Sequence, residues 1–503
     1  MNEPAGSPFA ADAWRFRIKR PAILACCAAL SAFGLPAHGQ EASPSNNRGV
    51  VDQSSQGIDP ASRAPRRLRS AATSPQCASA QHWDRKIAMC MPDGGPKRKE
   101  INGVTSQLSE TTRPNSGPAE MQSAASSSPP DRSMDSNMKM GGSSETNPKS
   151  TLMFHLNQFL LYSSTSGPRG ASRLTGPGYW MLTYDNDLTA KNHLSVSVMG
   201  SPEQLTVGDS GTPQLLQTDN IDNFHAHDTI MAFEFRDVMA LGNGNNQRLT
   251  LMFAPRGEAA IGPVPFMHRA SAEGNPDAPL GHALQDGFHD ASTVLGMEFQ
   301  IVRTTVEVTA FSGQNITWPL PLHNPDSYSF RLNQDFDDHV RVGASYADAL
   351  LPNDAGGAEH NQFISAWLTT SHRIHGGALK SAFVWGSTRV HHEAFLNSFL
   401  EEAVYQSGKN GFSGRAEILQ IAPAQLALVT TDGAADSKWV GALTVGYERT
   451  LFEKHDLSVL VGGSYTKNFV PAAFQPAYGS DPNGAKIYLR IKFMRDRASE
   501  TRD

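Results

Sequence analysis

The feature that most constrains this chain is a repeated segment of about ten residues, between positions 151 and 494, in which apolar and polar side chains alternate. In the last such segment, one face carries Ile487, Leu489, Ile491 and Phe493, and the other carries Tyr488, Arg490 and Lys492. Successive side chains of a β-strand point in opposite directions, so this pattern predicts strands with one apolar face and one polar face.

The segments predict strands near 152–162, 178–186, 192–200, 227–237, 247–255, 291–301, 304–313, 326–335, 339–348, 361–371, 377–387, 393–405, 412–421, 438–449, 456–468 and 485–494. The connections between them alternate in length: long ones include 201–226, 256–290 and 349–360, whereas Val302-Arg303 is barely a tight turn. Long loops at one end and short turns at the other are typical of a barrel in a bacterial outer membrane. A soluble β-sandwich has no reason to segregate its loops in this way. We therefore predict an all-β fold, a transmembrane antiparallel outer-membrane β-barrel of about sixteen strands over residues 151–494.

The phase of the alternation predicts which side chains face lipid. Phe233, Phe299 and Leu489 fall on apolar faces, whereas Gln300 falls on a polar one. In the segment from His227 to Arg236, we expect the side chains at 229, 231, 233 and 235 to share one face. Charged residues make up 18% of the chain, which excludes a bundle of membrane helices, and the net charge of -6 indicates no nucleic-acid partner.

The residues before the barrel have a different composition. Residues 1–39 combine a basic stretch, a short apolar run and small residues before a cleavage point, which is typical of a secretory signal peptide. Residues 40–150 are rich in Ser, Pro, Asn and Gly, so we expect a mostly disordered periplasmic arm. Within the arm, Cys77 and Cys90 can form a disulfide that closes a small loop. Residues 495–503 form a charged C-terminal tail.

Two of the long loops concentrate histidine. The first ends with His225, His227 and Asp228, and the second contains His268, His282, Asp286 and His289. Alternate residues of an extended segment leave it on the same side, so His225 and His227 can reach one ion. Neutral imidazole suits copper and zinc, so these residues are a candidate metal site, with either aspartate as a ligand or as the partner that orients a ring. The alternative is that the histidines only form hydrogen bonds inside a packed loop plug.

These loops resemble an uncharacterised family of proteobacterial outer-membrane β-barrel proteins that is associated with copper and heavy-metal resistance genes. The resemblance covers about 152–494 and is carried by His225-Ala226-His227-Asp228, Pro265-Phe266-Met267-His268-Arg269 and Asn275 to His282. The family typically has His-Pro-His-Asp at the first motif, and a second histidine directly after the position of His282, where this chain has alanine. Met134, Met138 and Met140 in the arm are also similar to the arm of copper-resistance outer-membrane proteins, and thioethers suit Cu(I).

The leading hypothesis from the sequence is therefore a barrel that binds or transports copper or another heavy metal. Its expected partners are outer-membrane lipid, metal ions and periplasmic metal-resistance proteins. The first alternative is a general porin or solute channel with a structural loop plug. The second is an outer-membrane lipid hydrolase using Ser292 near His289, although no recognisable catalytic motif is present and we expect no enzyme.

Overall fold

The computed structural model describes residues 150–498, apart from the gaps 243–245, 287–290, 314–321, 353–356, 390–393 and 430–435, and two short strands closer to the N-terminus. The chain divides into two units, 1–121 and 122–503. In the first unit, β1 (Gln81–Asp84) and β2 (Met89–Pro92) pair antiparallel, with Trp83 opposite Cys90. The proposed signal peptide, Cys77, the methionines at 134, 138 and 140, and the last five residues lie outside the described residues.

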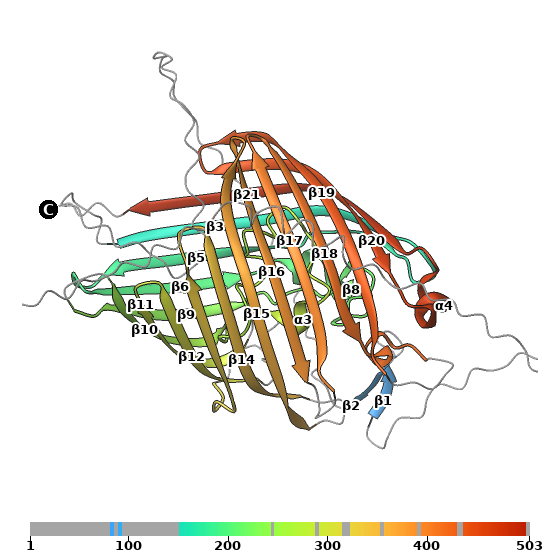
Figure 1. Ribbon diagram of the computed structural model, residues 1–503, viewed down its shortest axis with the longest axis horizontal. Coiled ribbons are helices and arrows are strands. Elements are labelled where there is room, and N and C mark those ends of the chain that lie inside the picture. The colour runs from blue at the N-terminus through green and yellow to red at the C-terminus, as the bar shows by residue number, and fades with distance from the viewer. Residues whose placement is uncertain are drawn as a thin grey trace, which may run out of the picture. The chain divides into compact units, whose positions relative to one another are not determined.

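The second unit is a closed antiparallel barrel (Figure 1). Its strands are β3 (Ser150–Thr165), β4 (Ser172–Thr175), β5 (Gly178–Asp187), β6 (Asn192–Gly200), β9 (Ala232–Ala240), β10 (Gln247–Gly257), β11 (Ala291–Ile301), β12 (Thr304–Ser312), β13 (Ser327–Asp335), β14 (Val340–Pro352), β15 (Ala358–Ile374), β16 (Gly377–Arg389), β17 (Leu396–Ser407), β18 (Asn410–Ile421), β19 (Lys438–Lys454), β20 (Leu457–Phe469) and β21 (Asn483–Ala498). Strand β21 pairs with β3 and closes the barrel. Both β4 and β5 pair with β3, so β4 extends the position of β5 and the circumference has the predicted sixteen strands.

Each predicted strand has a counterpart, although several bounds differ from the prediction. The short strand β4 was not predicted. Strands β14 and β15 extend to Pro352 and from Ala358, so most of the predicted connection 349–360 is strand. Strand β9 begins at Ala232 rather than at 227. The ladder with β6 pairs Ala232 with Met199, whereas the bond from the Met231 amide to the Met199 carbonyl is one residue out of that register. His227 consequently lies in a loop, and the Met231 side chain packs against Met181 and Met199 instead of sharing a face with Phe233.

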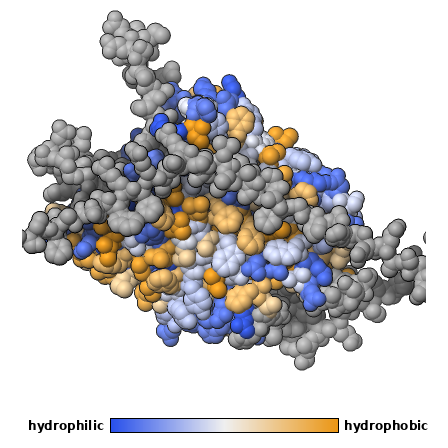
Figure 2. Space-filling model, viewed as in Figure 1, coloured by the Kyte–Doolittle hydropathy of each residue, from blue (hydrophilic) through white to orange (hydrophobic). Residues whose placement is uncertain are grey.

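The outer surface of the barrel carries an apolar band. Large apolar side chains that are more than a third exposed occupy outward positions on many strands, and include Leu160, Leu251, Met297, Val308, Phe330, Val342, Phe399, Ile418, Val445 and Ile487. The strand register also places the rows of Phe233, Phe299 and Leu489 outward and that of Gln300 inward, as predicted. On the face seen in Figure 2, hydrophobic side chains gather on part of the barrel surface, beside hydrophilic ones. An exposed apolar band around a closed barrel indicates contact with lipid.

The long loops contain the remaining short elements. Loop 201–231 contains α2 (Glu203–Thr206), β7 (Thr212–Pro213) and β8 (Asn223–Phe224), and the connection between β10 and β11 contains α3 (His282–Gln285). Further along the chain are η1 (Pro423–Leu426), η2 (Ala472–Phe474) and α4 (Gln475–Tyr478). Within the described residues, no helix is long and apolar enough to cross a membrane.

The core of the molecule lies inside the barrel, where loops pack against the wall. One apolar cluster joins Leu216 and Leu280 from two loops to Leu419 and Val440 of the wall. A second joins Ile261 to Phe311 and other residues of β10–β15. The lumen is therefore filled by chain segments from the long loops, and these segments position the candidate site.

Candidate functional site

Residues 258–286, which we call the plug loop, contact the lumen wall on several sides. The loop forms hydrogen bonds with inward side chains of many strands, including β12, β13, β14, β15, β17, β18 and β21. These bonds join Ala260 to Thr309, Gly262 to Ser345 and Arg331, Gln285 to Ser365, Arg269 to Glu402, Asp277 to Arg415, and Gly274 to Tyr488. A loop bonded to strands so far apart around the circumference crosses the lumen.

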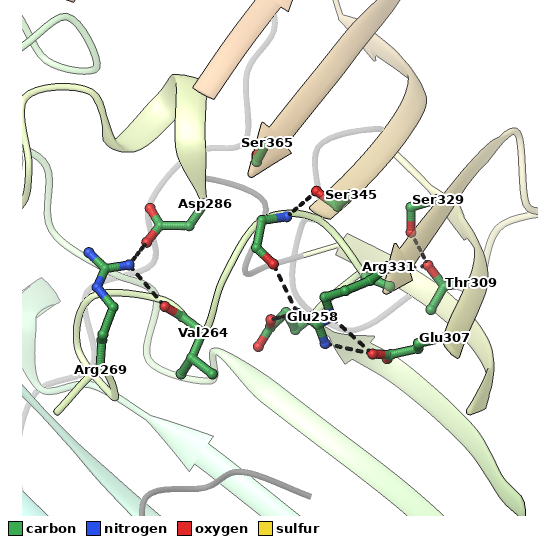
Figure 3. A network of polar contacts seen from close by, with 12 residues as sticks. Glu258, Val264, Arg269, Asp286, Glu307, Thr309, Ser329, Arg331, Ser345 and Ser365 are labelled. Carbon is green, nitrogen blue, oxygen red and sulfur yellow. Dashed lines mark hydrogen bonds and ion pairs between the residues drawn. The ribbon is translucent and has the colours of Figure 1, made fainter. Parts of the chain in front are cut away.

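Arg269 is the main polar anchor of the plug loop (Figure 3). Arg269 is 5% exposed, and its guanidinium donates to Glu402 at 2.5 Å, to Asp286 at 2.6 Å and to the Val264 carbonyl at 3.0 Å. Burial alone would raise the pKa of Asp286, but the charge of Arg269 and the hydrogen bond with His282 lower it. Asp286 is therefore ionised at neutral pH, and Arg269 ties two parts of the plug loop to strand β17.

The structure brings three of the predicted histidines together around one phenylalanine. The Phe224 ring centroid lies 4.8 Å from that of His225, 5.2 Å from His227 and 6.2 Å from His282. The rings of His225 and His227 are 5.3 Å apart. Burial and the neighbouring His227 lower the pKa of His225 to about 4, so this imidazole is neutral at pH 7.

The other contacts of these residues are mostly with charged partners. His227 Nδ1 lies 2.8 Å from Glu203 Oε2, and the same oxygen accepts from the His227 amide at 2.8 Å. His282 Nδ1 lies 2.7 Å from Asp286 Oδ1, so Asp286 orients this ring. Burial opposes protonation of His282, but the hydrogen bond and charge of Asp286 raise its pKa above the ordinary value.

The remaining predicted ligands lie elsewhere. Asp228 accepts from Arg256 at 2.6 Å. His268 contacts Tyr179, with ring centroids 4.7 Å apart, and His289 falls outside the described residues. Within the described part of the chain, no three His, Cys, Asp or Glu side chains are grouped closely enough to hold a metal ion. Ser292, the residue suggested for a hydrolase, is fully buried and so does not present its hydroxyl at an accessible rim.

A cavity of about 130 Å³ lies between the plug loop and the wall formed by β3, β5 and β21. His155, His227 and His268 all line it, together with Arg490 and Lys492 of β21. His155 was not among the predicted site residues, although the alternation in the first strand places it on the face opposite Leu152 and Leu156. Sequence periodicity could have found this histidine as an inward-facing residue.

No family model and no curated protein sequence matches this chain. Similar solved structures include an anion-selective porin from Comamonas acidovorans, with 12% identity and a TM-score of 0.42, covering 68% of this chain and 99% of the porin. OmpF of Salmonella typhi, in a complex with daunomycin, has 12% identity and a TM-score of 0.43, with 69% and 98% covered. OccAB4 of Acinetobacter baumannii has 10% identity and a TM-score of 0.35, with 70% and 99% covered. These comparisons show no family, and the association with copper resistance stays a prediction.

Proposed function

We propose that this chain is a bacterial outer-membrane channel for small polar solutes, in which the plug loop forms the constriction. The observation that carries the proposal is the contrast between the two surfaces of the barrel. Its exterior is an apolar band suited to lipid, whereas its interior is lined by charged residues and contains an inserted loop. A closed barrel satisfies its backbone hydrogen bonds within a bilayer, and a polar interior is typical of barrels that admit water.

The charges inside the barrel are of both signs. Arg331 of β13 donates to Glu307 at 2.7 Å and to Glu258 of the plug loop at 3.0 Å (Figure 3). On the wall formed by β19 and β21, Arg490 pairs with Glu448 at 3.2 Å. Mixed charge along both walls suits small hydrated solutes and gives neither cations nor anions a uniform field to follow.

Shortening the plug loop should increase the conductance of the barrel severalfold. The backbones of Gly262 and Gln285 lie side by side, since a Cβ atom added at Gly262 would be 2.1 Å from the Gln285 carbonyl oxygen. Residues 263–284 can therefore be replaced by a short glycine linker while the bonds of Gly262 to Ser345 and of Gln285 to Ser365 remain. The measurement is single-channel conductance in planar lipid bilayers.

The control for this deletion is the migration of unheated and heated protein on a denaturing gel, which reports whether the barrel has folded. A folded deletion variant that conducts no better than the parent would show that the plug loop is not the constriction. If neither protein conducts, the channel proposal is wrong.

A second candidate function is the binding of Cu(II) or Zn(II) at the loop histidines. It is favoured by one observation, the 5.3 Å separation of the His225 and His227 rings, with the His225 ring neutral at pH 7. Two neighbouring imidazoles are suitable ligands for either ion. Asp228 and Asp286 are each bonded to an arginine, so neither carboxylate can reach such an ion without giving up that bond.

For this candidate, replacing both His225 and His227 by alanine should weaken Cu(II) and Zn(II) binding to the full-length protein by about tenfold or more. The measurement is isothermal titration of each metal into protein refolded in detergent. His360→Ala plus His193→Ala is the matched control, because these histidines lie in strands and pair with Asp348 and Asp185. Equal binding by the parent and the His225/His227 variant would assign those two rings a structural role only.

A further inference from the structure

One group of side chains in the lumen has an unusual composition. Five of the 16 methionines in the chain meet in one cluster, which consists of Tyr179, Met181, Met199 and Met231, with Met153 and Met267 packed against it. Two other apolar clusters of the lumen, around Leu216 and around Ile261, consist mainly of Leu, Ile, Val, Phe and Ala. The methionine cluster contains no Leu, Ile or Val among the described residues.

The strand register explains how the cluster forms. His155 of β3 lies opposite Met181 of β5, and Met181 lies opposite Met199 of β6, so the three form one inward-facing row. The Met231 amide donates to the Met199 carbonyl at 2.8 Å, which places the fourth residue at the end of this row. Directly opposed residues of neighbouring strands have Cβ atoms about 5 Å apart, so these side chains reach one another.

The plug loop adds a second imidazole to this row. His268 Nε2 lies 3.2 Å from the sulfur of Met199. The Tyr179 ring contacts both imidazoles, with its centroid 5.5 Å from that of His155 and 4.7 Å from that of His268. Both histidines and Met267 line the 130 Å³ cavity between the plug loop and the wall, so the two imidazoles lie between that cavity and the methionines of the row.

We propose that this methionine row, together with His155 and His268, is a lumen site for a soft monovalent metal ion, Cu(I) or Ag(I). Thioethers are soft ligands that bind Cu(I) in preference to hard cations, and imidazole is compatible with copper. The site differs from the sequence-predicted cluster, since none of its methionines was predicted and His268 is the one residue in common. It requires no carboxylate, and the site's thioether and imidazole groups carry no negative charge to attract Mg²⁺ or Ca²⁺.

The test uses the full-length protein in detergent, with its methionines labelled in the methyl group with carbon-13 and Ag(I) as the probe. Cys77, Cys90 and the arm methionines also offer sulfur ligands, so the readout must be specific to each residue. Methyl resonances are assigned by single methionine-to-leucine substitutions. We expect the Met181, Met199 and Met231 resonances to shift when Ag(I) is added. The affinity for Cu(I) is measured in competition with a Cu(I) chelator, and we expect the protein to bind Cu(I) at the same site.

The decisive variant replaces Met181, Met199 and Met231 together by leucine, which nearly conserves side-chain volume. The matched control replaces Met239, Met252 and Met297 by leucine, which removes three thioethers outside the row. We expect the first variant to lose about tenfold or more in Cu(I) affinity at one site and the control to keep it. If the first triple variant fails to fold, Met199→Leu alone serves the same comparison. An unchanged Cu(I) affinity in the folded triple variant would show that the row has only a packing role. The same conclusion would follow if Ag(I) shifted the resonances of other methionines but not those of the row.

Discussion

Replacing Arg269 by methionine should lower the free energy of unfolding of the barrel by about 3 to 5 kcal/mol, because the change leaves buried carboxylates without their counter-charge. Asp286 and Glu402 are each 1% exposed, and each accepts a short hydrogen bond from Arg269. Glu402 keeps a second partner in Arg415 at 2.9 Å, so Asp286 loses more than Glu402 does. The measurement is urea unfolding of protein refolded into lipid vesicles, followed by tryptophan fluorescence.

The pH of this measurement matters. The pKa of Asp286 is lowered in the folded protein, so the stability that its pairing contributes is complete above its ordinary pKa and disappears as the pH falls through the folded pKa. Unfolding should therefore be compared near neutral pH. Arg449→Met is the matched control, because Arg449 is exposed and bonds to Asn410 at 2.9 Å. Exposed ion pairs contribute less than about 1 kcal/mol to the free energy of unfolding. A loss of that size in the Arg269 variant would contradict the role of Arg269 as an anchor.

Replacing Phe330 by arginine should destabilise the barrel by about 2 to 4 kcal/mol, because the side chain lies on the lipid face near the middle of β13. The neighbours opposite it are Val308 and Tyr346, which offer no negative charge to pair with an arginine. We expect loss of heat-modifiable migration and of assembly into membranes. The depth dependence of the cost makes this prediction specific.

Phe469→Arg is the matched control for that substitution. Phe469 is also outward and 53% exposed, but it is the last residue of β20, where an arginine should cost only about 0 to 1 kcal/mol. If the Phe330→Arg and Phe469→Arg proteins assembled equally well, the lipid-facing band would not be centred on the middle of the strands.

Much of the fold follows from local sequence. The alternation of apolar and polar residues places Phe299 toward lipid and Gln300 toward the lumen, because the direction of a side chain in a strand depends only on its position in the repeat. The alternation of long and short connections also predicts a barrel and the number of its strands. It can do so because each hairpin is formed by residues that are close together in the chain. The same local pattern gave a wrong prediction at Met231, because the backbone before Ala232 is one residue out of register with β6.

The lumen was decided by contacts between residues far apart in the chain. Arg269 and Glu402 are separated by 133 positions, and no sequence motif indicates that the two residues pair. Loop histidines suggested one metal site, but the folded loops bond Asp228 and Asp286 to arginines and place His268 beside Met199. The sequence by itself determined the strands and the side that each presents to lipid, because alternation is a local property. Only the tertiary structure decided which side chains contact one another in the lumen, because those contacts depend on how strands from the whole chain close around the plug loop.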